Sequence, residues 1–217
     1  MTGCQNDKVN GDDNRPRHTV ISLLLEEESY GVDEPSHARI LHTLQTFPHK
    51  PSLQVMVNRR NSLQPQRLYR YFRALGLLHL QFTPVVEFDE RQQLKTHSVR
   101  PDEWGHFLLS VFNIWVREDV GSVHIQLFDS TLDTWCGYSS TTNSGEREQV
   151  KECRQCTVLP FCQGDCPKHR NADGKSALCE GYRQFFTHSA PYMKAMRDLL
   201  KQRRSPVELM VMLNQSR

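Results

Sequence analysis

Hydrophobic and polar positions along the chain predict strands and helices in turn. Residues 53–57 (LQVMV) and 78–83 (LHLQFT) are short apolar runs of the kind that form strands. A helical pattern lies between them, beginning at Pro65 and ending at Gly76. A strand, a helix and a strand within about 30 residues predict a βαβ unit with parallel strands.

The next helix is predicted over residues 101–119. Its apolar side chains recur at helical spacing: Trp104, Phe107, Leu108, Val111, Phe112 and Trp115. Residues 36–46 suit a short helix, and residues 123–128 read as a third strand. This alternation over residues 35–136 predicts an α/β fold, as in one side of a β/α barrel or in an open sheet.

Two polar stretches flank this region. Residues 1–34 are expected to be poorly ordered, although they contain the apolar patch VISLLL, which is either a short strand or a short helix. Residues 137–150 are rich in Ser and Thr and predict a linker. Residues 151–217 follow as a cysteine-rich region with C-terminal helices.

Two helices are predicted at the C-terminal end. The first runs over about residues 180–203, and Pro191 is expected to kink or divide it. The second covers residues 206–213. The basic run at 201–204 is best explained as compensation of the helix dipole in the last turn.

Composition narrows the class of protein. The 217 residues carry a formal charge of +2, and 37% are hydrophobic. This balance gives no electrostatic preference for nucleic acid or for a membrane surface. No run approaches the roughly 20 apolar residues that span a bilayer, and the N-terminus has no apolar signal core. We therefore expect a cytoplasmic protein without membrane or nucleic-acid partners.

Five of the seven cysteines fall close together, and they are the strongest chemical signal. Cys153, Cys156, Cys162 and Cys166 are spaced C-x2-C-x5-C-x3-C, and Cys179 follows. Thiols stay reduced in the cytoplasm, so clustered cysteines are metal ligands before they are disulfides. The C-x2-C turn presents two thiolates to one centre, and its backbone N–H groups lower their pKa.

The spacing fits either a zinc ion or an iron–sulfur cluster. A zinc ribbon usually has two C-x2-C knuckles, and this chain has one, which weakens zinc without excluding it. A metal that only staples loops together is the alternative. His169 lies beside the cysteines and is the one histidine considered as a further ligand. Glu87 and Asp89 follow a strand end, and a solvated loop is the favoured interpretation there.

Several stretches, in the same order along the chain, resemble the anaerobic sulfatase-maturating enzymes. They are the cysteine pattern followed by P-K and LCEGYRQFFTHSAPYMKAM, and upstream VNRRNSLQP, HLQFTPVVE and WGHFLLSVFNIWVREDVG. The resemblance covers residues 35–136 and 147–214, and the cysteine segment is similar to the family's C-terminal SPASM region. Separated motifs in one order are far more specific than one cysteine pattern.

The resemblance implies radical S-adenosylmethionine chemistry in a partial β/α barrel, with formylglycine made from a Cys or Ser of a sulfatase. It also implies two auxiliary [4Fe-4S] clusters. By family position, Cys153, Cys156, Cys162 and Cys179 ligate the second of these, and Cys166 ligates the first. The expected partners are a sulfatase or a full-length maturase.

Parts of the family's machinery are missing from these 217 residues. The C-x3-C-x2-C motif, whose three cysteines leave one iron free for S-adenosylmethionine, is absent. The piece that supplies three ligands of the first auxiliary cluster is replaced by the linker, so Cys166 lacks partners, and Cys136 does not match a ligand position. We expect one complete [4Fe-4S] cluster, no catalytic residues, and no cleavage of S-adenosylmethionine by this chain alone.

Three functions therefore remain open. The chain is a homologue of the maturases that is inactive alone, a non-enzymatic module that binds a sulfatase or a maturase, or a zinc-ribbon-like regulatory protein. Half a barrel leaves open sheet edges, so the strand at residues 53–57 is expected to lack a neighbour unless VISLLL covers it.

Overall fold

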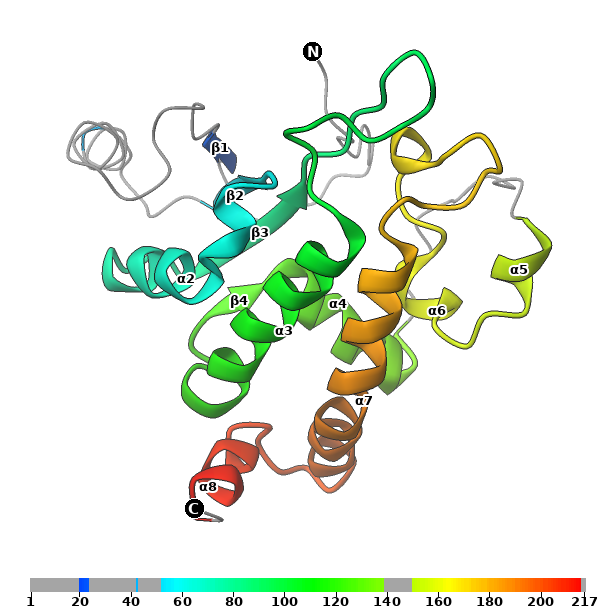
Figure 1. Cartoon of the computed structure of the whole chain (residues 1–217). Coiled ribbons are helices and arrows are strands. Elements are labelled where there is room, and N and C mark those ends of the chain that lie inside the picture. The colour runs from blue at the N-terminus through cyan, green and yellow to red at the C-terminus, as the bar shows by residue number, and fades with distance from the viewer. Residues whose placement is uncertain (1–19, 24–41, 43–51, 139–149, 216–217) are drawn as a thin grey trace, which may run out of the picture.

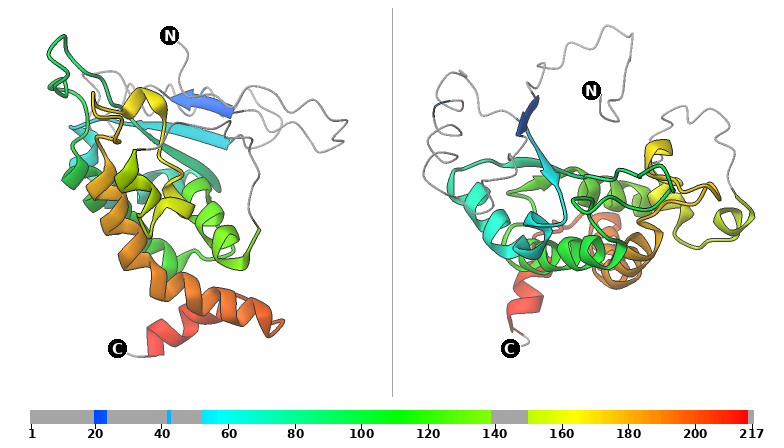
Figure 2. Two further views of the ribbon diagram at one scale, coloured as in Figure 1. Left: turned by 90° about the vertical axis from the view of Figure 1, so that its right-hand side faces the viewer. Right: turned by 45° about the horizontal axis from the view of Figure 1, so that its top comes forward.

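The computed structural model describes residues 20–23, 42, 52–138 and 150–215. Within this part, four parallel strands form one sheet in sequence order. They are β1 (Val20–Leu23), β2 (Ser52–Val57), β3 (His79–Pro84) and β4 (His124–Ile125). Helices α2, α3 and α4 lie on one side of this sheet, and α7 packs beyond them (Figures 1 and 2). The predicted mixed α/β class is confirmed.

The βαβ unit forms as predicted. Helix α2 (Pro65–Ala74) joins β2 to β3, which pair in parallel with Leu53 opposite Leu80. Alternate residues of β2 and β3 are buried, so one face of the sheet packs against the helices. The opposite face carries half-buried polar side chains, and Gln54 Nε2 donates a hydrogen bond to Thr83 Oγ1 at 3.0 Å.

Helix α3 (Pro101–Glu118) forms the centre of the core. The apolar stripe expected along it is buried throughout, and Trp104, Phe107, Leu108, Val111 and Phe112 are at most 1% exposed. Phe107 meets Phe82 of β3 edge-on, with ring centroids 5.1 Å apart. On its other side α3 contacts α7, so this helix joins the sheet to the C-terminal region.

The third predicted strand is largely wrong. Strand β4 contains only His124 and Ile125, and residues 126–136 form helix α4 (Gln126–Cys136). The apolar run VHIQLF is short enough to fit either structure. The segment forms a helix because its buried and partly buried residues fall on one helical face, which packs on α7. These residues are Leu127, Phe128, Thr131, Leu132 and Trp135.

The edge of β2 is paired. Strand β1, formed by the first four residues of the VISLLL patch, lies parallel to β2 with Val20 opposite Ser52. The patch therefore covers the edge that a half barrel was expected to leave open. The rest of residues 1–34 lies outside the described part, and so does the helix predicted over 36–46, apart from the helical residue His42.

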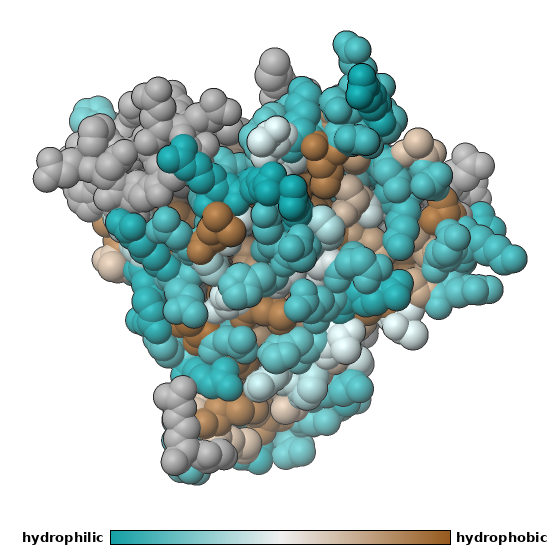
Figure 3. Space-filling model, in the orientation of Figure 1, coloured by the Kyte–Doolittle hydropathy of each residue, from teal (hydrophilic) through white to brown (hydrophobic). Residues whose placement is uncertain are grey.

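The remaining elements are helical. They are η1 (Asn61–Leu63), α5 (Lys151–Arg154), α6 (Leu159–Cys162), η2 (Pro167–His169), α7 (Cys179–Lys201) and α8 (Glu208–Gln215). Pro191 does not divide α7, which runs as one assigned helix, although its axis changes direction along its length (Figures 1 and 2). The face seen in Figure 3 is mostly hydrophilic, with separate apolar patches rather than one large one.

Helices α3 and α7 cross at a pair of glycines. A Cβ on Gly105 would lie 2.9 Å from the Cα of Gly181, and a Cβ on Gly181 would collide with the carbonyl oxygen of Pro101. Both helices therefore approach backbone to backbone at this point. Gly181 is the third residue of α7, so the crossing fixes where that helix begins.

The glycine crossing makes a direct prediction. Gly181→Ala should lower the free energy of unfolding by about 1–3 kcal/mol, because the added methyl forces two packed backbones apart. Urea denaturation measures this. Thr187→Ala, at an exposed position of the same helix, is the matched control and should change stability little. Equal stability of Gly181→Ala and the unaltered protein would show that the crossing tolerates a wider spacing.

Candidate metal centre

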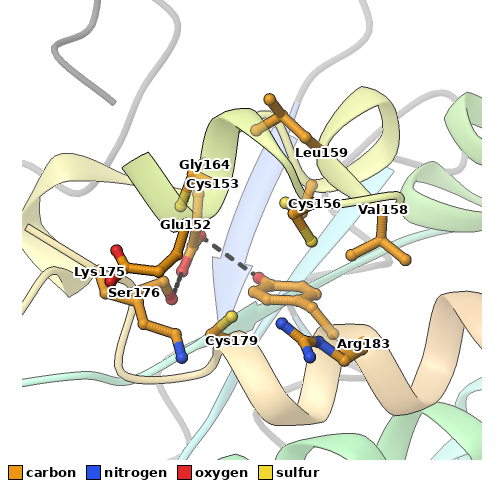
Figure 4. Close-up of a pocket in the computed structure, with 13 residues that line it drawn as sticks. Glu152, Cys153, Cys156, Val158, Leu159, Gly164, Lys175, Ser176, Cys179 and Arg183 are labelled. Atoms are coloured by element: carbon orange, nitrogen blue, oxygen red, sulfur yellow. Dashed lines mark hydrogen bonds between the residues drawn. The ribbon is translucent and has the colours of Figure 1, made fainter. Parts of the chain in front are cut away.

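Four of the five clustered cysteines line one pocket. Cys153 lies in the short helix α5 and Cys156 in the turn after it, Cys162 ends α6, and Cys179 begins α7. All four border one small pocket that is partly open to solvent. Figure 4 shows the side chains of Cys153, Cys156 and Cys179 around this pocket. Residues 26 positions apart in sequence thus meet at one place.

Short backbone hydrogen bonds shape the turns that carry these cysteines. The N–H of Cys156 donates to the carbonyl oxygen of Cys153 at 3.0 Å, and the N–H of Cys162 donates to that of Val158 at 3.1 Å. The N–H of Cys179 donates to the carbonyl oxygen of Ser176 at 3.1 Å. Each cysteine therefore lies at the end of a tight helical turn, a position whose backbone is fixed locally.

The pocket wall is apolar on one side and charged at its rim. Val158, Leu159 and Tyr182 supply the apolar part, and Lys175 and Arg183 supply two cations. Lys175 Nζ lies 3.7 Å from Glu180 Oε1. Two acidic side chains, Glu152 and Asp165, line the pocket as well.

Two thiols in the pocket have raised pKa values. Burial raises the pKa of the Cys162 thiol to about 11, although the backbone N–H of Gly164 donates a hydrogen bond to it and acts in the opposite direction. Burial also raises the pKa of Cys179, against the nearby charges of Lys175 and Arg183. A metal or cluster that binds here must displace protons from these two groups.

A buried carboxylate also lines the pocket. Asp165, between Cys162 and Cys166, has a side chain only 10% exposed. Burial would raise the pKa of Asp165, but the hydrogen bond and charge of His169 and the hydroxyl of Ser176 outweigh it and hold that pKa below its usual range. The carboxylate is therefore ionised at neutral pH.

The other predicted candidates lie elsewhere. Cys166 is disulfide-bonded and does not line the pocket, so its ligation of a metal stays a prediction for the reduced protein. His169 is directed to Asp165, with Nδ1 3.1 Å from Oδ2, rather than to the pocket. Cys136 ends α4 away from the pocket.

The loop after β3 was not expected to be a site. Glu87 is an exposed partner of Lys95 at 3.0 Å, as expected of a solvated loop.

Zinc and an iron–sulfur cluster ask for different spacings of the same four sulfurs. Among the described residues, no group of three or more His, Cys, Asp or Glu side chains is placed to hold one metal ion. Tetrahedral zinc, with Zn–S bonds of about 2.3 Å, would draw its four sulfurs tightly around one point. A [4Fe-4S] cluster holds four thiolates farther apart, because four irons lie between them. Four cysteines line this pocket, which is the number of thiolates that either group takes.

Three residues at the site were not predicted. Ser176 and Tyr182 both donate hydrogen bonds to the carboxylate of Asp165, at 2.7 and 3.4 Å. In sequence Asp165 and Ser176 look like parts of solvated loops, and Tyr182 looks like a core aromatic. The one available signal was the position of Asp165 between two cysteines.

No helix in the described part of the chain is long and apolar enough to span a membrane. No protein-family model matches the chain. The chain is 41% identical to the uncharacterized protein YidF of Escherichia coli K12, over 73% of this chain and 90% of YidF. It is 30% identical to the serine-type anaerobic sulfatase-maturating enzyme of Bacteroides thetaiotaomicron, over 71% of this chain and 55% of that enzyme.

The two alignments differ in their gaps. The alignment with the Bacteroides enzyme runs over 229 positions but takes up only 71% of this 217-residue chain, so that enzyme carries several tens of residues that this chain lacks inside the aligned region. The alignment with YidF, over 160 positions, needs no such gap. The chain spans about half the length of the curated maturases that it matches.

The fold of this chain is similar to that of a solved structure. A structure described as native anSMEcpe with bound AdoMet superimposes with a TM-score of 0.62 at 17% identity, covering 83% of this chain and 69% of that one. A likeness at this identity concerns the fold alone, and it covers most of this chain.

Proposed function

The chain belongs to one family with YidF and the anaerobic sulfatase-maturating enzymes, and from that premise we propose that it is an iron–sulfur protein of the maturase type. It binds one [4Fe-4S] cluster through Cys153, Cys156, Cys162 and Cys179. The observation that carries the proposal is the meeting of these four cysteines, and no others, at one pocket of the described residues. When bound, such a cluster supplies one-electron transfer.

The residues around the pocket serve that role in distinct ways. Lys175 and Arg183 offset the negative charge that four thiolates bring to the centre. Val158, Leu159 and Tyr182 limit the access of water to it, which tunes the reduction potential of a cluster. The turn at Cys156 and the one-turn helix that ends at Cys162 hold the backbone of these two cysteines.

The chain contributes to sulfatase maturation, the process in the names of its relatives, as a cluster-bearing part rather than as a complete enzyme. These 217 residues lack the C-x3-C-x2-C motif, and they span about half the length of the curated maturases. A second candidate function is binding to a sulfatase or to a full-length maturase. The polar face of the sheet, with Gln54 and Thr83, favours it, because parallel sheets are normally covered on both faces.

The ligand set can be tested by metal analysis of single variants. Replacing any of Cys153, Cys156, Cys162 or Cys179 with alanine should remove most of the iron and sulfide bound after anaerobic reconstitution. Cys136→Ala, a cysteine outside the pocket, is the matched control and should retain them, together with the brown absorption near 400 nm. Zinc without iron in the unaltered protein would contradict the cluster and favour the zinc-ribbon alternative.

A second prediction concerns the cleavage of S-adenosylmethionine. The reconstituted chain, incubated with S-adenosylmethionine and a strong reductant, should form no 5′-deoxyadenosine above the level without protein. The reason is that these 217 residues contain no C-x3-C-x2-C motif, whose three cysteines would leave one iron of a cluster open to S-adenosylmethionine. Chromatography of the reaction mixture measures the product. Turnover by this chain alone would overturn the proposed dependence on another chain, and co-purification with a maturase or a sulfatase would support it.

A further inference from the structure

The loop that leaves the pocket after Cys162 has an unusual backbone. Gln163, Gly164 and Asp165 all have positive φ angles, of 51°, 77° and 56°. This left-handed conformation is unfavourable for residues with a Cβ, and Asp is among the few that tolerate it because its side chain can hydrogen-bond locally. A strained residue that persists in a structure points to surroundings that hold it in place.

Asp165 is held by hydrogen bonds from three separate segments. Ser176 Oγ donates to Oδ2 at 2.7 Å, and Tyr182 OH donates to Oδ1 at 3.4 Å. His169 Nδ1 lies 3.1 Å from Oδ2, and the backbone N–H of Cys166 also donates to the carboxylate. With a side chain only 10% exposed, this carboxylate has protein groups in place of water as its main partners.

The same contacts reach the start of α7. Ser176 Oγ accepts a hydrogen bond from the N–H of Leu178 at 3.1 Å, and its carbonyl oxygen accepts one from the N–H of Cys179 at 3.1 Å. Tyr182 lies one helical turn beyond Cys179. Asp165 therefore connects the loop that follows Cys162 to the turn that carries Cys179.

We propose that Asp165 is a positioning residue, whose carboxylate holds Cys162 and Cys179 at the spacing that retains the cluster. The inference rests on the proposed function. Asp165 is not itself a ligand, and it acts through Ser176 and Tyr182. Its negative charge close to an anionic centre also makes the cluster harder to reduce.

The isosteric variant Asp165→Asn tests this role. It keeps the shape of the side chain but loses the charge and half of the acceptor capacity. Iron should be lost to a chelator about 10- to 100-fold faster than from the unaltered protein, the range for groups that orient metal ligands. The midpoint potential of the cluster should become more positive. Asp173→Asn, an exposed acid nearby, is the control and should match the unaltered protein.

Single hydrogen bonds can be removed if Asp165→Asn fails to fold. Tyr182→Phe and Ser176→Ala should each accelerate iron loss by a smaller factor, with thermal unfolding near that of the unaltered protein. Unchanged chelation rates in these variants, or an unchanged rate and potential in a folded Asp165→Asn, would overturn the proposal.

A readout without iron separates this inference from the proposed function. In the metal-free, reduced protein, a short bis-alkylating reagent should cross-link Cys162 to Cys179, and Asp165→Asn should lower that yield several-fold. An iron-free protein that still shows this difference would reject the cluster but keep the positioning role. Equal cross-linking yields in the two proteins would reject the positioning role even where the cluster binds.

Discussion

The contact between Gly105 and Gly181 is the constraint on which the rest of the arrangement depends. Helix α3 is fixed to the sheet by its buried aromatic stripe, and at Gly105 and Gly181 it meets α7 at a backbone-to-backbone distance that leaves no room for a Cβ. Because Gly181 is the third residue of α7, this approach also places Cys179 and Tyr182. The cysteine-rich loops thus form their pocket against a helix whose start is set by core packing.

The pocket is formed by one long helix on one side and by short helices and loops on the other. Cys179 belongs to a long helix that contacts α3, α4 and α8. Cys153, Cys156 and Cys162 lie on helices of one turn and their connecting loops, which have little core of their own. A bound metal group would join these two parts, which Asp165 also links through Ser176 and Tyr182.

Sequence reasoning found the parts whose signal is periodic or dense. The stripe of α3 and the βαβ unit follow from spacing alone, and both predictions agree with the structure. The set of Cys153, Cys156, Cys162 and Cys179 came from the family resemblance, and the structure brings these four to one pocket. The prediction failed where a short segment fits two structures. Residues 123–128 were expected to form a strand, but helix α4 begins at Gln126.

It also failed where the answer depends on long-range contacts. The pairing of β1 with β2 joins residues about 30 positions apart, and only the outcome of folding decides it. The role of Asp165 depends on a left-handed backbone and on Ser176 and Tyr182, which no local pattern reveals. Cys166 is disulfide-bonded, whereas all the cysteines were expected to be reduced thiols in a cytoplasmic protein.

Anomalous X-ray diffraction from crystals grown without oxygen can identify and locate a metal group in this pocket. With data collected on both sides of the iron absorption edge, we expect one compact iron signal enclosed by Cys153, Cys156, Cys162 and Cys179. A signal that appears only at the zinc edge, or an iron signal away from these four cysteines, would contradict it.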